Sequence, residues 1–65
     1  MIVYGIFMNI SDYEFSVDDV LARDKDGNFL VFLDEEKAKI NLPKNELDRY
    51  HQGTTYEIKP LDVIN

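Results

Sequence analysis

The sequence predicts a mainly β domain, a small five-stranded antiparallel sheet with one short helical turn before the last strand. Three observations support this fold class. Short runs of β-branched and aromatic residues recur along the 65 residues, as they do in strands. The pair Asp26-Gly27 lies between two of these runs and is a strong hairpin signal. Residues 37–42 alternate between polar and apolar side chains, which is typical of a half-buried strand.

The length allows one domain, residues 1–65, with a marginal core. A chain of this size buries only about 60% of the surface that its unfolded form exposes. The sequence has no cysteine, so neither a disulfide nor a thiolate zinc site can stabilise it. Its hydrophobic content of 45% nevertheless indicates an ordered domain. Stability must therefore come from good packing or from self-association.

The first predicted strand is residues 2–8, which are apolar on both faces and therefore need cover on two sides. Turn residues follow, and residues 14–17 alternate as a second short strand. Asp18 and Asp19 interrupt this alternation, which resumes at Val20 with a shift of one residue. The interruption predicts a β-bulge or a bend between two strand segments.

The pair Asp26-Gly27 predicts a tight turn that joins two antiparallel strands, because both residues tolerate a positive φ. Residues 29–33 are five consecutive apolar residues and are predicted to form the central strand of the sheet. Residues 37–42 are predicted as the next strand. The alternative is an α+β fold in which Asp34 caps a helix over residues 35–42. The period-two spacing of the apolar residues favours the strand.

A helical turn is predicted over residues 43–51, because Pro43 suits a first helical position and Gly53 ends the segment. Residues 54–59 are the last predicted strand, which ends at Pro60 because proline cannot donate to a sheet. Residues 61–64 are left as an apolar extension that we expect to pair with the first strand.

Three motifs lie in the part of the chain between Asp26 and Ile58. They are Asp-Gly-x-Phe-x-Val from Asp26, Leu-Pro-x-x-x-Leu from Leu42 and Gly-x-x-Tyr-x-Ile from Gly53. In this half of its length the chain resembles small prokaryotic SH3-like β-barrel proteins of unknown function. The resemblance implies a strongly bent five-stranded barrel with its helical turn at residues 43–51. The motifs consist of turn and core residues, so the resemblance implies an architecture and no catalytic residue.

The net charge of −6 is unevenly distributed, because residues 1–22 contain four acids and no base. These acids are Asp12, Glu14, Asp18 and Asp19. A chain of this charge is repelled by phosphate backbones and attracts basic proteins. The apolar start of the chain has no positive charge and is far shorter than a membrane span of about 20 residues. We therefore expect a cytoplasmic protein that binds neither nucleic acid nor membranes.

Few residues are suited to catalysis or to metal binding. His51 is the only histidine and follows the predicted helical turn, and Ser11 and Ser16 are the only serines. Asp24, Asp26, Asn28 and Glu35 have the spacing of calcium-loop ligands. Gly27, however, is not at the position where such a loop requires glycine. We therefore expect a non-catalytic protein without a cofactor or a metal.

The function predicted is protein binding. Strands that are apolar on both faces leave outward side chains to be covered by the C-terminal extension or by another chain. We assign Val3, Phe7, Leu30 and Phe32, or the residues that alternate with them, to this set. We expect self-association through these residues and recognition of a basic protein by Asp12, Glu14, Asp18 and Asp19. The alternative is an acidic inhibitor that mimics nucleic acid, as small proteins of phage or accessory genomes can do.

Overall fold

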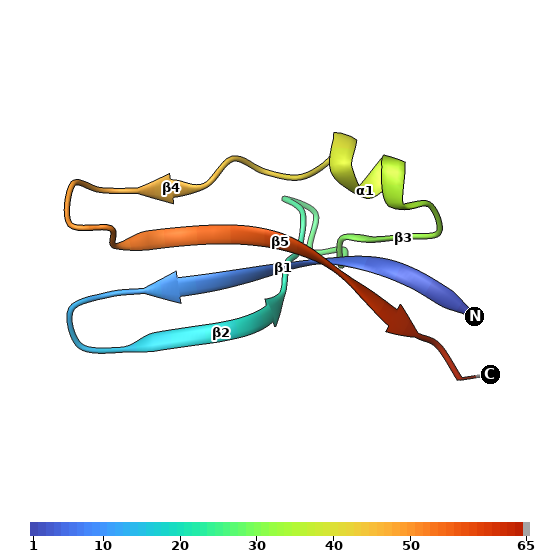
Figure 1. The fold of residues 1–65 in the computed structure, drawn as a ribbon, viewed down its shortest axis with the longest axis horizontal. Coiled ribbons are helices and arrows are strands. Elements are labelled where there is room, and N and C mark those ends of the chain that lie inside the picture. The colour runs from blue at the N-terminus through green and yellow to red at the C-terminus, as the bar shows by residue number, and fades with distance from the viewer. Residues whose placement is uncertain (65) are drawn as a thin grey trace.

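A computed structural model of the chain describes residues 1–64 (Figure 1). The elements are β1 (Ile2–Ser11), β2 (Ser16–Leu21), β3 (Val31–Phe32), α1 (Glu35–Ile40), β4 (Glu46–Leu47) and β5 (Gly53–Asp62). The five strands form one antiparallel sheet in the order β2-β1-β5-β4, and β3 also pairs with β1. The predicted mainly β fold with five antiparallel strands and one short helix is therefore confirmed.

The central strand is β1, not residues 29–33. It pairs with β5 over its whole length, and on its other side with β2 and β3. Of the predicted central strand only Val31 and Phe32 are in strand conformation. The long antiparallel pairing of β1 with β5 accounts for this outcome, because it gives β1 partners on both sides.

The pairing of β1 with β5 extends beyond Pro60, so that Leu61 lies opposite Val3. This confirms the predicted pairing of the C-terminal extension with the first strand. Val63 N donates to Met1 O at 2.8 Å, so by alternation Pro60 has its backbone nitrogen on the outer edge of β5. Proline is tolerated inside this strand because the missing N–H would not have bonded to β1.

The sheet is not closed into a barrel. The chain is elongated, with extents of 40 × 22 × 21 Å, and β2 and β4 lie on opposite edges of the sheet (Figure 1). Since β4 has two residues and pairs only with the first two residues of β5, no strand joins the two edges. The barrel closure implied by the family resemblance is therefore wrong.

The helix is residues 35–40, which was the alternative prediction, and the strand predicted over residues 37–42 is wrong. Asp34 Oδ1 accepts a hydrogen bond from Glu36 N at 2.9 Å and so caps the first turn. Acidic residues lie in the first turn and lysines in the last, which matches the helix dipole. Ala38 is the buried residue of α1, whereas Ile40 is 81% exposed. In residues 35–40 the capped helix therefore forms, although the apolar residues that follow Glu36 alternate as they would in a strand.

The helical turn predicted over residues 43–51 is also wrong, because this segment contains β4 and the turn of the β4–β5 hairpin. Asp48 Oδ1 accepts hydrogen bonds from the backbone N–H groups of Tyr50 and Gln52 at 2.8 and 3.0 Å. An aspartate side chain that accepts hydrogen bonds from the backbone N–H groups two and four residues later stabilises a turn and not a continuing helix.

Two local predictions are confirmed. Asp18 and Asp19 together lie opposite Asn9, since the register shifts between Met8 and Ile10; this is a β-bulge, with Asp19 at φ 59°. The hairpin at Asp26-Gly27 also forms, with Gly27 at φ 85°. Its two arms are antiparallel at the bridge between Arg23 and Phe29.

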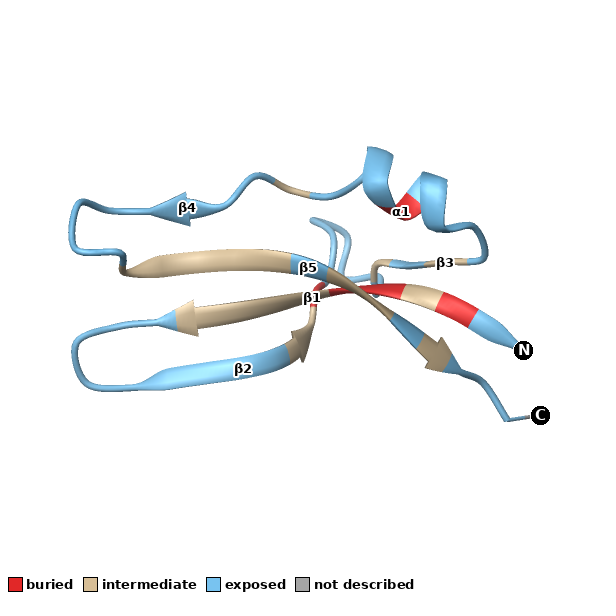
Figure 2. Cartoon of the chain, viewed as in Figure 1, coloured by how far each residue is buried: buried red, intermediate tan, exposed pale blue. Residues whose placement is uncertain are grey.

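The core is small and lies at one end of the molecule. Only four apolar residues of the described chain are buried, namely Val3, Ile6, Ala22 and Ala38. Figure 2 shows them on the half of β1 near the N-terminus, at the start of the 23–29 hairpin and on α1. The opposite half, which contains the β1–β2 and β4–β5 turns, has no buried residue among those described. We call this half the hairpin end.

Candidate interaction surfaces at the hairpin end

The hairpin end is built from two hairpins, β1–β2 and β4–β5, whose turns lie at the same end of the molecule (Figure 1). The rings of Tyr13 and Tyr50, one from each tip, have centroids 6.4 Å apart. The two side chains are nevertheless 72% and 56% exposed. This contact joins the edges of the sheet only at its tip, and both faces of the sheet remain accessible.

One face of the sheet here is polar. Asn9 of β1 donates from Nδ2 to Glu57 Oε1 at 3.2 Å and accepts the backbone N–H of Asp19 at 2.9 Å. Lys59 Nζ lies 3.4 Å from Glu57 Oε1 and donates to Asp19 Oδ1. The hydrogen bond to Asp19 is the main cause that raises the pKa of Lys59, with a further contribution from the charge of Glu57. We call this surface the polar face.

The other face is apolar. Alternate residues of a strand point to opposite faces, so Met8 and Ile10 point away from Asn9. Met8 lies opposite Val20 and Tyr56, and Ile10 lies opposite Val17. Side chains that face each other across paired strands share a face. Ile58 shares this face because it lies opposite Ile6, and Thr54 shares it because it lies opposite Ile10. We call the apolar members of this surface the apolar face; they are Met8, Ile10, Val17, Val20, Tyr56 and Ile58.

Within residues 1–64 no second layer packs over the apolar face. The helix α1 packs against β1 and β3 at the opposite end of the molecule (Figure 1). The side chains of the apolar face are half-buried by their neighbours, and Val17 is 39% exposed. A sheet with one apolar face is normally stabilised by a packed second layer.

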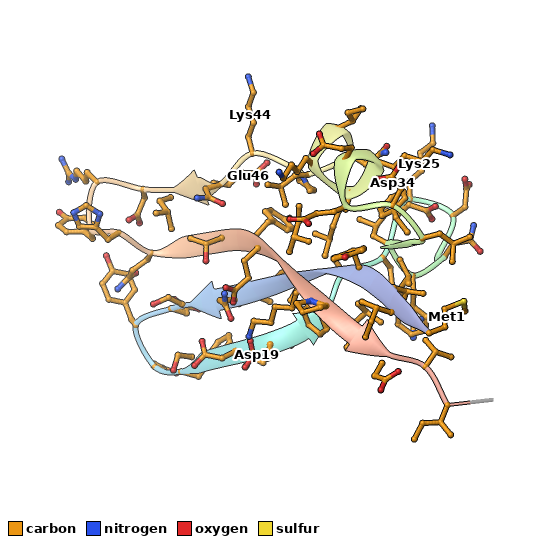
Figure 3. The ribbon with its side chains drawn as sticks, turned by 45° about the vertical axis from the view of Figure 1, so that its right-hand side comes forward. Met1, Asp19, Lys25, Asp34, Lys44 and Glu46 are labelled. Carbon is orange, nitrogen blue, oxygen red and sulfur yellow. The ribbon has the colours of Figure 1, made fainter. Side chains whose placement is uncertain are left out.

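The negative charge is concentrated at this end. Residues 11–19 and 46–59 contain seven of the thirteen acids but only two of the seven Lys and Arg residues, Arg49 and Lys59. Lys59 is already paired with Asp19 and Glu57. Figure 3 shows Asp19 at this end, whereas Lys25 lies near α1. The hairpin end therefore attracts cations more strongly than the rest of the chain.

The structure places the four predicted acidic residues together on the β1–β2 hairpin, and all four are exposed. Two of them have specific hydrogen-bond partners. Asp12 Oδ1 accepts the N–H of Tyr13 at 2.7 Å, Asp19 bonds to Lys59, and Glu14 and Asp18 extend the acidic surface.

The four predicted apolar residues do not form one outer surface. Val3 is 5% exposed and belongs to the core, so its assignment as an outward residue is wrong. Phe7 is half-buried beneath Lys59, whose Nζ lies 5.8 Å from the ring centroid. Leu30 and Phe32 are half-buried at the other end of the sheet, where Leu30 O accepts from Ile6 N at 2.9 Å.

The apolar face is not apparent from the sequence alone. Apart from Gly5, every residue from 2 to 8 has an apolar or aromatic side chain. The periodicity of this segment therefore could not show which face of the strand is left uncovered. The alternation at Phe15 and Val17 was a usable signal, but the bulge reverses its phase. Register had to be known before the face could be assembled.

The other candidate residues have structural roles or lie in solvent. Asp24 Oδ1 accepts the N–H groups of Asp26 and Asn28, both at 2.9 Å, so the calcium-like spacing belongs to a turn. His51 is exposed in the β4–β5 turn at φ 61°. Residues 1–64 contain neither a pocket nor a group of three potential metal ligands. Within the same residues no helix has the length and apolar character to cross a membrane.

No family model matches the sequence, and neither a curated protein nor a solved structure is detectably similar to it. The resemblance to SH3-like proteins of unknown function therefore stays a prediction.

Proposed function

We propose that this protein is a protein-binding module that recognises a basic protein through the acidic surface of its hairpin end. The observation that carries the proposal is the concentration of seven acids against two bases in residues 11–19 and 46–59. Charge of one sign on one end of an elongated molecule steers an oppositely charged partner to that end. Such steering weakens as salt is added.

The acidic surface is also held in a defined shape. The bulge fixes Asp19, because Asn9 accepts its N–H and Lys59 binds its carboxylate. Glu14 and Asp18 are exposed beside it. A preformed charged surface loses little conformational freedom on binding, which favours affinity.

Capture of basic proteins by a charge-reversed variant tests the proposal. Glu14→Lys with Asp18→Lys changes the net charge of the hairpin end from −5 to −1, and Asp26→Lys with Glu36→Lys makes the same change in net charge at the other end. We expect the first variant to lose the proteins captured by the wild type at low salt and the second to retain them. Equal losses in both variants would show that net charge alone governs capture and would overturn the proposal.

The identity of the captured proteins separates this function from nucleic-acid mimicry. A mimic would capture nucleic-acid-binding proteins, and added DNA or RNA would release them from the wild type. Captured proteins that remain bound in the presence of nucleic acid would support the general binding module.

A further inference from the structure

Exposed aromatic side chains gather in the two turns of the hairpin end. Of the four aromatic residues that are exposed in residues 1–64, Tyr13 and Phe15 lie in the β1–β2 turn and Tyr50 lies in the β4–β5 turn. The fourth, Phe29, lies outside the hairpin end. Aromatic residues are enriched at protein interfaces relative to the rest of the surface. The two turns are therefore a candidate contact surface.

Tyr13 and Tyr50 are held in a fixed arrangement although both are exposed. Their ring planes are inclined by 55° at a centroid distance of 6.4 Å, which lies within the range of about 4.5–7 Å of favourable aromatic pairs. An aspartate of the same turn fixes each backbone. Asp12 Oδ1 accepts the N–H of Tyr13 at 2.7 Å, and Asp48 Oδ1 accepts that of Tyr50 at 2.8 Å. The ring pair is therefore formed before a partner binds.

The surroundings of the two rings are negative. Asp12 and Glu14 flank Tyr13 in the sequence, and Asp48 precedes Tyr50 by two residues. These three carboxylates are exposed, and none of them forms an ion pair within the described chain. Since the face of an aromatic ring is itself negative, rings and carboxylates attract a cation together.

One of the two rings already has a cation over it. The Cζ atom of Arg49 lies 4.8 Å from the centroid of Tyr50, which is a cation–π contact. No Lys or Arg of the described chain lies over Tyr13, which is 72% exposed. Residues 1–22 also contain no base that could neutralise its acidic neighbours. Tyr13 is therefore the ring of the pair that is open to a cation from another molecule.

The chemistry of the surface favours a guanidinium as the ligand. A guanidinium is planar, is weakly hydrated, stacks on aromatic rings and donates to carboxylates with several N–H groups. The ammonium of lysine is a strongly hydrated point charge, so stacking gives it less. An apolar ligand would remove water from the carboxylates without replacing their hydrogen bonds.

We infer that an arginine side chain of the basic partner stacks on the ring of Tyr13, with Tyr50 supporting that ring and Asp12 and Glu14 balancing the charge of the guanidinium. This inference rests on the proposed recognition of a basic protein and names the residue type that is recognised. Tyrosine and arginine are among the residues that contribute most to binding at interfaces. The hairpin end therefore selects arginine-containing segments among basic proteins.

Binding of two dye-labelled peptides of equal length, oligoarginine and oligolysine, tests the inference by fluorescence anisotropy at low salt. We expect the wild type to bind oligoarginine more tightly. Tyr13→Leu keeps the net charge and an apolar side chain but removes the ring, so it should weaken oligoarginine binding about two- to fivefold. Its affinity for oligolysine should change less. Tyr13→Phe retains the ring and should bind as the wild type does.

Phe29→Leu is the matched control, because it removes an exposed ring that lies under Arg23 outside the hairpin end. It should bind both peptides as the wild type does. Equal affinity of the wild type for the two peptides, or unchanged oligoarginine binding by Tyr13→Leu, would overturn the inference. The proposed acidic recognition would still stand if Glu14→Lys with Asp18→Lys lost both peptides. A wild type that binds neither peptide would overturn the inference and the proposed function together.

Nuclear magnetic resonance of the wild type covers the case in which Tyr13→Leu fails to fold. Oligoarginine should shift the ring-proton resonances of Tyr13 and leave those of Phe29 unchanged, because only the first ring receives a guanidinium from the peptide. Oligolysine should shift the Tyr13 resonances less. Tyr13 resonances that do not move when oligoarginine is saturating would contradict the inference without the use of any variant.

Discussion

Lys59 is the residue at the hairpin end whose ionisation is tied to folding. Its hydrogen bond to Asp19 and the nearby charge of Glu57 raise its pKa above the ordinary value of 10.5. Because the folded pKa exceeds the unfolded one, the ion pair contributes its full stability below pH 10.5 and loses it as the pH rises through the folded pKa. Lys59→Met should therefore lower the urea midpoint at neutral pH, with the difference disappearing in strong alkali.

The control for this experiment is Lys44→Met, because Lys44 is exposed on the segment before β4 (Figure 3). Its midpoint should follow the wild type at every pH. A difference between Lys59→Met and wild type that does not change with pH would show that packing around residue 59, and not its charge, causes the effect.

At the scale of elements, the β4–β5 hairpin depends on Gly53. This residue has φ 142°, and a Cβ atom there would lie 1.9 Å from the carbonyl oxygen of Glu46 on β4. Gly53→Ala must therefore separate β4 from β5, at a cost of about 2 kcal/mol in unfolding free energy. Chemical denaturation measures this cost, and faster amide exchange in residues 46–54 would locate it.

Gly27→Ala is the matched comparison, because Gly27 also has a positive φ of 85° but a Cβ atom there meets nothing within 4 Å. This substitution carries only the backbone cost of about 1 kcal/mol. If both alanine variants lost the same stability and exchange at β4 were unchanged, the close approach of β4 to Gly53 would not be a determinant of the hairpin.

Elements that depend on residues close together in the sequence could be predicted. Elements that depend on pairing between distant strands could not. The Asp26-Gly27 turn and the bulge at Asp18 and Asp19 depend on residues a few positions apart, and both were predicted. The helix α1 was ranked below a strand because apolar alternation was weighted above the Asp34 cap. The central position of β1 follows from pairing with β5, about 50 residues later in the chain, which no local pattern encodes.

The candidate surfaces divide in the same way. The acidic residues were found from the sequence because charge is visible without a structure. The apolar face was not found, since its six members come from three strands and are brought together by register. The openness of the sheet was also missed, because closure depends on how the two distant edges meet.

At the scale of the whole molecule, the separation of the core from the negative charge predicts that the acidic surface lowers stability. The hairpin end has no buried residue among those described, and it contains seven acids against two bases. Like charges held close together repel one another and destabilise the folded state. Glu14→Lys with Asp18→Lys should therefore raise the urea midpoint at low salt, and the gain should shrink as added salt screens the charges. Asp26→Lys with Glu36→Lys should show no such gain, because these residues lie outside the hairpin end. If the first variant had the wild-type midpoint at low salt, the acids of the hairpin end would attract a basic partner without lowering the stability of the fold.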